Sequence, residues 1–454
     1  MSENQKTLIG KINPDVLSFT VGLDPVLDLN LTVWDCIGTA AHVTMLSKMK
    51  MTPPILTKAE KDKVITALKA IIVEAKEGRF TITEADQDVH LAVERRLTER
   101  LGELGRKVHT GRSRNDQVAV DIRLHVRDEL LVMTGEVASL AEALVTFGKR
   151  HEKLPMVGRT HLQPAMPSSV GLWATGYAEA LLDDLILVDA AYTFNDRCPL
   201  GSAAGYGVPL PIDRNLTAKL LAFSEPYHNV FHASNMRGKN EAILLAACGQ
   251  LMLTLSRMAE DLILFSMPEF GYFVLPSDLC TGSSIMPQKY NPDVLELIRA
   301  KTAIVLGLGS AATNLLKSMP GGYNRDLQES KALYMEGLRV TRASLRIMTL
   351  MAQSLGVNAE RLRAGFTPGV FATDFALELV AGGMPFRDAY QKVRSNLEAL
   401  ASENPDKALA KKNHLGGTAG LDFNLYRARI RHARQWANVH LKKSTTAFKK
   451  LMGC

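Results

Sequence analysis

The sequence is poor in several features that would assign it to a specialised class of protein. It has only five cysteines in 454 residues, and no two lie close enough together to suggest a metal clip or a redox pair. We therefore expect a reducing compartment and no structural disulfide. The N-terminus is polar and lacks the apolar core of a signal peptide. The longest strongly apolar run, residues 242–253, is interrupted by Gly249 and Gln250 and is too short to cross a bilayer.

An excess of charge is also missing. The net charge is +7, the pI is about 9.0, and the basic residues are spread along the chain instead of forming blocks. Nucleic-acid binding requires a clustered basic face or a recognisable module, and the sequence shows neither. We therefore expect a soluble, cytoplasmic protein that binds neither nucleic acid nor membrane. The mild positive charge slightly favours an acidic small-molecule substrate.

Strand signals, internal repeats and low-complexity tracts are scarce as well, whereas helical periodicity is plentiful. Apolar residues recur at steps of three or four over residues 112–154, which predicts a helix of roughly 60 Å. The same rhythm predicts helices at 173–192, at 244–265 and from Pro292 to about Lys317. Rods with one long apolar face need partners, so we expect an all-α bundle, with bundles joined across subunits.

The length is enough for two or three domains. We expect a helical N-terminal domain at 1–110, a central domain of long helices at 111–358 and a small helical domain at 359–454. Proline and glycine pairs that punctuate the chain before residue 110 and after residue 355 support this division.

The segment 282–292 carries the strongest chemical signal. A flexible Gly-Ser-Ser opening, which contains Ser283 and Ser284, precedes the cation Lys289. Asn291 and Pro292 then predict a helix start, with Asn as the N-cap and Pro in the first turn. A hydroxyl, a cation and a positive helix end suit a small anion on which negative charge grows during reaction. The alternative is an ordinary Ser/Gly loop before a helix.

Two further motifs offer groups for binding a carboxylate and moving a proton. Arg114 and Asn115 stand at the start of the first long helix, where Arg and backbone N–H groups can grip a carboxylate. His161 follows Thr160 in a turn and is a natural proton carrier. Glu296 lies about one turn into the later helix and could orient that imidazole. A capped helix end and a surface histidine are the alternatives.

A polar cluster after residue 320 completes the candidates. The glycines at 321 and 322 allow a tight turn, and Tyr323, Gln328 and Lys331 form a set of hydrogen-bond donors and acceptors. This cluster is either part of a binding site or a solvated loop that leads into a helix.

Together these strings resemble the argininosuccinate lyase family of the fumarase/aspartase superfamily, from about Phe19 to Gly417. The 282–292 loop is similar to the whole superfamily, whereas Arg112-Ser-Arg-Asn-Asp and Thr160-His-Leu-Gln narrow the resemblance to this family. Further anchors are the strings at 35–42, 199–202, 256–263, 295–298, 323–328 and 383–387.

The resemblance implies an all-helical subunit of three domains and a homotetramer in which each active site combines strings from three chains. It implies reversible cleavage of argininosuccinate to arginine and fumarate, with no metal or organic cofactor. It also implies catalytic roles for four residues: Ser283 as the base, His161 supported by Glu296 as the proton donor, and Lys289 for the charge that develops. The substrate-binding residues that it implies are Arg114, Asn115, Thr160, Ser284, Asn291, Tyr323, Gln328 and Lys331.

The chain departs from the usual family pattern at Arg159, Tyr290, Gly22–Asp24 and Met236–Lys239. The last two leave the substrate preference open. Another lyase that releases fumarate from an N-substituted aspartate is one alternative. A non-catalytic structural protein, of the kind that lens crystallins represent, is the other.

Overall fold

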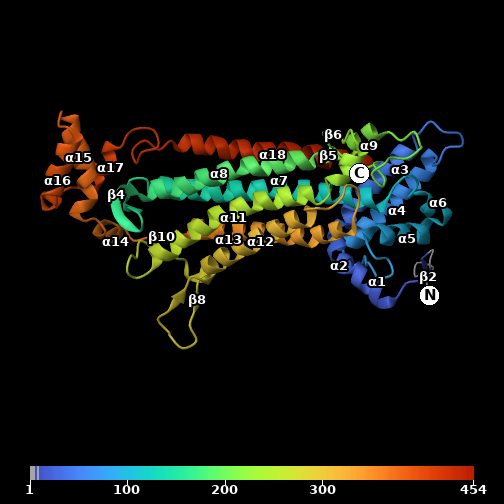
Figure 1. Ribbon diagram of the computed structural model, residues 1–454, viewed down its shortest axis with the longest axis horizontal. Helices are drawn as coiled ribbons and strands as arrows, with labels where there is room; N and C mark the ends of the chain where they lie inside the picture. The colour runs from blue at the N-terminus through green and yellow to red at the C-terminus, as the bar shows by residue number, and fades with distance from the viewer. Residues whose placement is uncertain (1–5, 8–9, 454) are drawn as a thin grey trace.

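The computed structural model describes residues 6–7 and 10–453. It is elongated and predominantly helical, as expected from the periodicity (Figure 1). Residues 1–5, whose polarity was noted above, and Cys454 lie outside the described residues. The other four cysteines are free thiols, and three of them are buried.

Six long helices lie side by side along the long axis and form a bundle (Figure 1). They are α7 Arg114–Arg150, α8 Val170–Asn195, α11 Lys239–Ser266, α12 Asp293–Leu316, α13 Ser330–Ser354 and α18 Phe423–Met452. Their inner faces belong to one continuous apolar core. The helices predicted at 112–154, 244–265 and 292–317 are confirmed, and α8 extends the one predicted at 173–192.

The start of α7 is fixed by its own residues. Ser113 is the N-cap, and its side chain together with that of Asp116 completes a capping box. Lys149 and Arg150 in the last turn complement the negative end of the helix dipole. With 37 residues, α7 is about 55 Å long, so it separates its two ends by most of the bundle length.

Shorter helices surround the Arg114 end of α7 (Figure 1). Their bounds are α1 Pro14–Val21, α2 Asp24–Leu27, α3 Thr32–Leu46, α4 Lys58–Lys76, α5 Val89–Leu101, α6 Glu103–Lys107, α9 Arg214–Leu220 and α10 Val230–Asn235, with 3-10 turns η2 Asp28–Leu31 and η4 Arg325–Glu329. α3 is buried on nearly all sides, because it packs against α4, α5 and α7 at once.

The opposite end of the bundle carries a β-hairpin and a second small core. The hairpin pairs β3 Pro155–Thr160 with β4 Gln163–Ser169. The small core involves α15, α16 and α17 together with the 3-10 turns η5 and η6. The elements here are α14 Ala359–Ala364, η5 Pro368–Phe371, α15 Ala372–Ala381, α16 Phe386–Arg394, η6 Leu397–Leu400 and α17 Pro405–Lys411.

The remaining strands are two residues long. They are β1 Lys6–Thr7, β2 Gly10–Lys11, β5 Arg197–Cys198, β6 Glu225–Pro226, β7 Phe273–Val274, β8 Thr281–Gly282, β9 Tyr290–Asn291 and β10 Gly356–Val357, with the 3-10 turn η3 at Ser277–Leu279. The β8–β9 hairpin projects from the side of the bundle (Figure 1).

The last helix returns to the bundle after the small core. α18 packs along α7 and α8, and its buried residues Phe423, Tyr426 and Ile430 belong to the main core. The division at 1–110, 111–358 and 359–454 stays a prediction. Residues 423–452 share the apolar core of the central segment, whereas α15–α17 have their own.

The apolar content of two bundle helices was underestimated from the sequence. By length and composition, α7 and α11 could each cross a membrane, and α1 with α2–α3 could add a third, bent span. In α11, Gly249 does not interrupt the helix, and its lack of a side chain gives Leu306 of α12 room to approach. The apolar windows of α7 and α11 are 61% and 56% buried within this chain, so much of their hydrophobicity serves packing.

The basic residues are also less evenly spread than we expect from the sequence. α18 contains no Asp or Glu but carries Arg427, Arg429, Arg431, Arg434, Lys442, Lys443, Lys449 and Lys450. Two of these pair with carboxylates of neighbouring helices: Arg429 with Asp183 at 2.5 Å and Arg434 with Glu142 at 2.5 Å.

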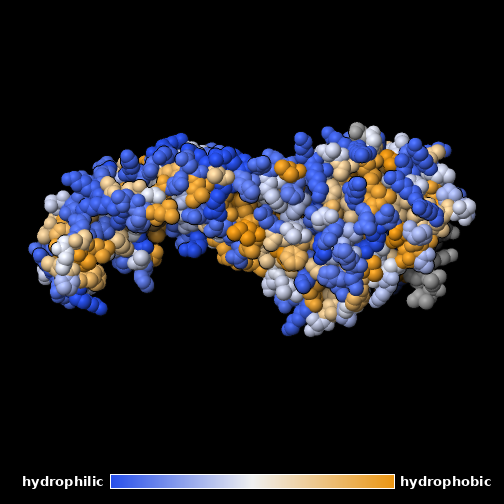
Figure 2. All heavy atoms as spheres, turned by 90° about the horizontal axis from the view of Figure 1, so that it is seen from above, coloured by the Kyte–Doolittle hydropathy of each residue, from blue (hydrophilic) through white to orange (hydrophobic). Residues whose placement is uncertain are grey.

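Apolar side chains also remain on the outside of the bundle. Figure 2 shows apolar surface gathered near the middle of the long axis. Exposed large apolar residues on the bundle helices include Ile186, Leu187, Leu253, Leu297, Ile304, Leu306, Leu350 and Val439. Apolar surface of this kind is typical of faces that associate with another chain.

Candidate active site

A cavity of about 120 Å³ lies where the first turn of α7 meets α2, the start of α5 and the segment before α13. Five of the residues predicted from the sequence line it: Arg114, Asn115, Tyr323, Gln328 and Lys331. Five charged or titratable side chains not predicted as site residues share its walls: Asp24, Asp88, His90, Arg237 and Arg325. The lining therefore carries both signs of charge.

Arg114 and Asn115 are placed by the capped start of α7. The carboxylate of Asp116 ties this turn to another loop, because its Oδ2 accepts the N–H groups of Gly201 and Ala203, both at 2.9 Å. Burial raises the pKa of Asp116, although these backbone hydrogen bonds oppose the shift. The Asp116 carboxylate thus joins two of the strings that carried the resemblance, the one at the start of α7 and the one at 199–202.

The Arg114 guanidinium has two partners within the chain but remains partly exposed. Its Nη1 lies 3.3 Å from Oδ2 of Asp88, and its Nη2 donates to Oε1 of Gln87 at 3.4 Å. The side chain keeps 40% exposure, so it retains donors for a ligand in the cavity.

Lys331 is fixed between two carboxylates. Its Nζ lies 2.8 Å from Asp24 and 2.7 Å from Asp28, and the side chain is 2% exposed. Burial raises the pKa of Asp24, and the nearby Lys331 only partly offsets this. Two of the three ammonium donors of Lys331 are therefore occupied before any substrate arrives.

Gln328 and Tyr323 border the same wall. The Gln328 side chain donates from Nε2 to the carbonyl of Thr20 at 3.0 Å, which leaves its oxygen to accept. Tyr323 is 38% exposed and lies against the guanidinium of Arg237.

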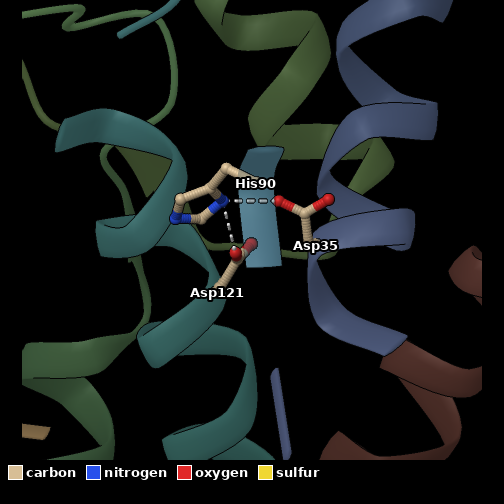
Figure 3. Close-up of side chains that lie close together, drawn as sticks. All are labelled: Asp35, His90 and Asp121. Atoms are coloured by element: carbon tan, nitrogen blue, oxygen red, sulfur yellow. Dashed lines mark hydrogen bonds and ion pairs between the residues drawn. The ribbon is translucent and has the colours of Figure 1, made fainter. Parts of the chain in front are cut away.

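A buried polar cluster lies behind the cavity and was missed from the sequence. His90 of α5 turns one ring nitrogen toward Asp35 of α3 and Asp121 of α7 (Figure 3). Its Nδ1 lies 2.7 Å from Oδ2 of Asp35 and 3.6 Å from Oδ2 of Asp121. Burial alone would lower the pKa of His90, but the hydrogen bond to Asp35 and the neighbouring carboxylates outweigh burial and raise it.

Asp35, His90 and Asp121 are grouped closely enough to ligate a metal ion, since their ligand atoms lie within 4.8 Å of one another. The cluster already contains compensating charge. His90 has a raised pKa, and the buried Arg112 guanidinium acts on both carboxylates. Its donor set suits an internal charge network better than a divalent cation.

The predicted catalytic loop lies elsewhere, on the β8–β9 hairpin. Ser284 and Lys289 are exposed, and Ser283 is half-buried. The Ser283 Oγ accepts the backbone N–H of Ile285 at 3.3 Å and that of Met286 at 3.1 Å. Its hydrogen-bond partners are thus within its own turn.

The predicted cap of the next helix is wrong. α12 begins at Asp293, with Pro292 as its N-cap residue and no side-chain cap. Asn291 instead belongs to β9, where its Nδ2 donates to the carbonyl of Gly282 at 3.5 Å. The hairpin pairing with β8 takes Asn291 out of the helix and turns its amide across the hairpin.

Thr160 and His161 occupy the turn of the β3–β4 hairpin. Both are exposed, and His161 has a positive φ of 53°. Glu296 is exposed on the first turns of α12. Within residues 6–7 and 10–453, no hydrogen bond or ion pair joins Glu296 to His161.

The predicted residues therefore fall into three separate places in one chain. Arg114 lies in the first turn of α7 and His161 lies beyond the other end of this helix, which is about 55 Å long. Because a rigid helix separates them, loop closure within the chain cannot bring these two side chains together.

Some of the unpredicted cavity residues had a signal in the sequence. Asp24 and Arg237 fall in the two segments, 22–24 and 236–239, where the chain departs from the usual family pattern. Arg325 lies inside the 323–328 string between Tyr323 and Gln328, whereas His90 had no such signal, because a single histidine in a helical stretch is common.

The same architecture occurs in solved lyase structures. The structure of EDDS lyase in complex with formate aligns with a TM-score of 0.82 and 24% identity, over 97% of this chain and 95% of that one. Recombinant class II fumarase from Schistosoma mansoni aligns with a TM-score of 0.67 and 16% identity, over 88% and 98%. The chain thus has the all-helical fold of the fumarase/aspartase superfamily of lyases.

Sequence comparison identifies the family within this class. A family profile described as Lyase matches residues 28–307. Argininosuccinate lyase from Sorangium cellulosum is 42% identical over 94% of this chain and 98% of its own length. Its counterpart from Thermotoga neapolitana is 41% identical over 84% and 95%. The chain belongs to the argininosuccinate lyase family.

Proposed function

We propose that this protein cleaves argininosuccinate to arginine and fumarate, as a step of arginine biosynthesis. The observation that carries the proposal is the identity of 42% with an argininosuccinate lyase over almost the full length of both chains. The cavity adds support, because Arg114, Asn115, Tyr323, Gln328 and Lys331 line one space.

The reaction is a β-elimination, and its main difficulty is to stabilise the negative charge that develops on the substrate. Ser283 removes a proton from the carbon beside a carboxylate of the succinyl half, and the electron pair spreads into that carboxylate. The C–N bond then breaks, and the guanidino nitrogen leaves with a proton supplied by His161. Lys289 and Asn291 stabilise the dianion that forms between these steps.

A serine alkoxide is costly in water, so Ser283 needs a cation and the exclusion of solvent. Lys289 lies in the same hairpin, and the exposed apolar side chains Ile285 and Tyr290 provide surface that can seal a site against a second chain. Glu296 orients His161 once the two meet in the assembly.

Substrate binding divides between the two halves of argininosuccinate. Arg114, Asn115, Thr160 and Ser284 grip the succinyl carboxylates, and Tyr323, Gln328 and Lys331 border the arginine half. Lys331 acts mainly by fixing the carboxylates of Asp24 and Asp28, since both already hold its ammonium group.

The active unit is a homotetramer whose sites combine three chains. The separation of Arg114 from His161 along α7 supports this, as does the apolar surface on the bundle. The reaction needs no metal or organic cofactor, and the protein is cytoplasmic, with neither nucleic acid nor membrane as a partner.

A fumarate-release assay tests the function directly. Argininosuccinate, adenylosuccinate and other N-substituted aspartates are supplied in turn, and fumarate is followed by its absorbance. Preference for argininosuccinate is the expected result. Preference for another compound of the panel favours the alternative lyase, and no release from any of them favours the crystallin-like structural protein.

A further inference from the structure

Arg237 is a buried cation without a carboxylate or hydrogen-bond partner in the part of the chain that the structure describes. Its side chain lines the cavity, yet the residue is only 6% exposed, and its Nε has no hydrogen-bond partner. Among the described residues, no carboxylate pairs with its guanidinium. The buried carboxyl of Glu241 is influenced by the Arg237 charge but accepts its hydrogen bonds from Ser330 and from the backbone at Gly238 and Glu241. A buried, unpaired guanidinium is costly, so this geometry indicates a place prepared for an anion.

The other cavity cations already have at least one partner each. Arg114 pairs with Asp88 at 3.3 Å, and Lys331 lies between two carboxylates. Arg325 donates from Nη2 to the carbonyl of Thr20 at 2.7 Å. Arg237 alone among these four lining residues keeps its full set of donors for a ligand.

The position of Arg237 determines which part of a ligand its guanidinium can contact. Its Cζ lies 5.2 Å from the centre of the Tyr323 ring, on the wall proposed for the amine half of the substrate. On the same wall, one Lys331 ammonium faces the two carboxylates of Asp24 and Asp28, which leaves an excess negative charge. A free guanidinium beside an excess of carboxylate groups is complementary to a ligand that carries both a carboxylate and an ammonium group.

We propose that Arg237 determines specificity by binding the α-carboxylate of the amino acid that the lyase releases. The inference rests on the proposed function and adds a requirement to it: the amine half must be an α-amino acid. A succinylated guanidine that lacks this carboxylate leaves Arg237 buried and unpaired, so it is a poor substrate.

The test compares two substrates in two cavity variants. Argininosuccinate is compared with its decarboxylated analogue, in which agmatine replaces arginine, and fumarate release gives kcat and KM. Arg237→Gln raises KM for argininosuccinate about 30- to 100-fold, with little change in kcat, because hydrogen bonds to charged groups are lost. The analogue is cleaved equally slowly by the wild-type protein and the variant.

Three controls accompany this comparison. Arg237→Lys keeps the charge without the forked geometry and recovers part of the lost affinity. Arg427→Gln makes the same chemical change on the exposed face of α18 and leaves both substrates unaffected. Inhibition by the product arginine weakens in Arg237→Gln, whereas inhibition by agmatine does not change.

The outcomes separate the inference from the function. If Arg237→Gln impairs both substrates by the same factor, or neither, the assignment of Arg237 is overturned while the lyase activity stands. If Arg237→Gln does not fold, Arg237→Lys and the arginine-versus-agmatine inhibition of the wild-type protein decide the assignment. A wild-type protein that releases no fumarate from argininosuccinate overturns the proposed function and this inference with it.

Discussion

Single residues around the proposed site differ in how firmly the fold holds them. Lys331 is fixed by two carboxylates, and His90 is fixed by Asp35, so both keep one geometry with or without a ligand. Ser283 and His161 are held only by the turns in which they lie. Lys331 is therefore preorganised at the cavity, whereas Ser283 and His161 lack contacts from other described segments of the chain that would fix them.

Replacing the proposed base tests this assignment. Ser283→Ala lowers kcat by at least about 10³-fold, because the proton acceptor is removed, but still binds the substrate. Rapid-reaction kinetics and equilibrium binding of argininosuccinate measure the two effects. Ser310→Ala, which removes an exposed hydroxyl of α12, serves as the matched control. Near-normal turnover in Ser283→Ala would exclude this serine as the base.

His90 predicts how stability depends on pH. Its pKa is raised in the folded protein, so folding favours the protonated ring. This contribution is complete below the ordinary pKa of 6.5 and is lost as pH rises through the higher folded value. Urea unfolding of wild type and His90→Gln should show a larger stability difference at about pH 6 than at about pH 9. His228→Gln, on the surface, gives the control, and an equal difference at both pH values contradicts the prediction.

Among the elements, the bundle depends on close approach at particular glycines. Gly337 of α13 faces Leu245 of α11, and a Cβ built at residue 337 would clash with that leucine side chain. Gly176 of α8 is exposed and has no atom within 4 Å of such a Cβ. One glycine is thus required by packing, and the other only weakens its helix.

This contrast gives a matched pair of stability measurements. Gly337→Ala lowers the free energy of unfolding by about 1–3 kcal/mol, because the core is overpacked. Gly176→Ala raises it by about 0.5–1 kcal/mol through helix propensity. Denaturant titration of both variants at one protein concentration measures the effects. Equal changes of the same sign would mean that the α11–α13 approach does not limit packing.

The molecule as a whole is long because its bundle helices run side by side along one axis, and α7 separates the two proposed halves of the site. Arg114 lies at the cavity end, and Thr160 and His161 lie just past the other end. In the proposed arrangement, a single chain therefore presents two incomplete sites. Association through the apolar surface of the bundle provides a physical way to complete both at once.

A complementation experiment tests this arrangement. Arg114→Ala and His161→Ala are each inactive alone, because every site in either homotetramer lacks one group. After the two variants are mixed, dissociated and reassembled, part of the activity returns, since some sites combine two intact halves. Reassembly of each variant by itself is the control. A mixture that forms mixed tetramers but stays inactive would place both residues in the same chain's site.

How much of the fold and of the site could be predicted from the sequence depended on how far apart in the chain the interacting residues lie. Periodicity predicted α7, α11 and α12, because an apolar stripe at steps of three and four depends only on residues in adjacent helical turns. It missed α13 and α18. The cap at Asn291 failed because pairing of β9 with β8 overrode a local preference.

By itself, the sequence determined the helical class, the family and the chemical groups available, since these depend on residue type and short spacing. Only the tertiary structure decided which groups share one space. It joined Arg114 to Tyr323 and Gln328, and it kept Ser283 and His161 apart from them. It also added Asp24, His90 and Arg237 to the cavity. The physical reason is that burial and unpaired charge arise from segments far apart in the chain, so no local pattern encodes them.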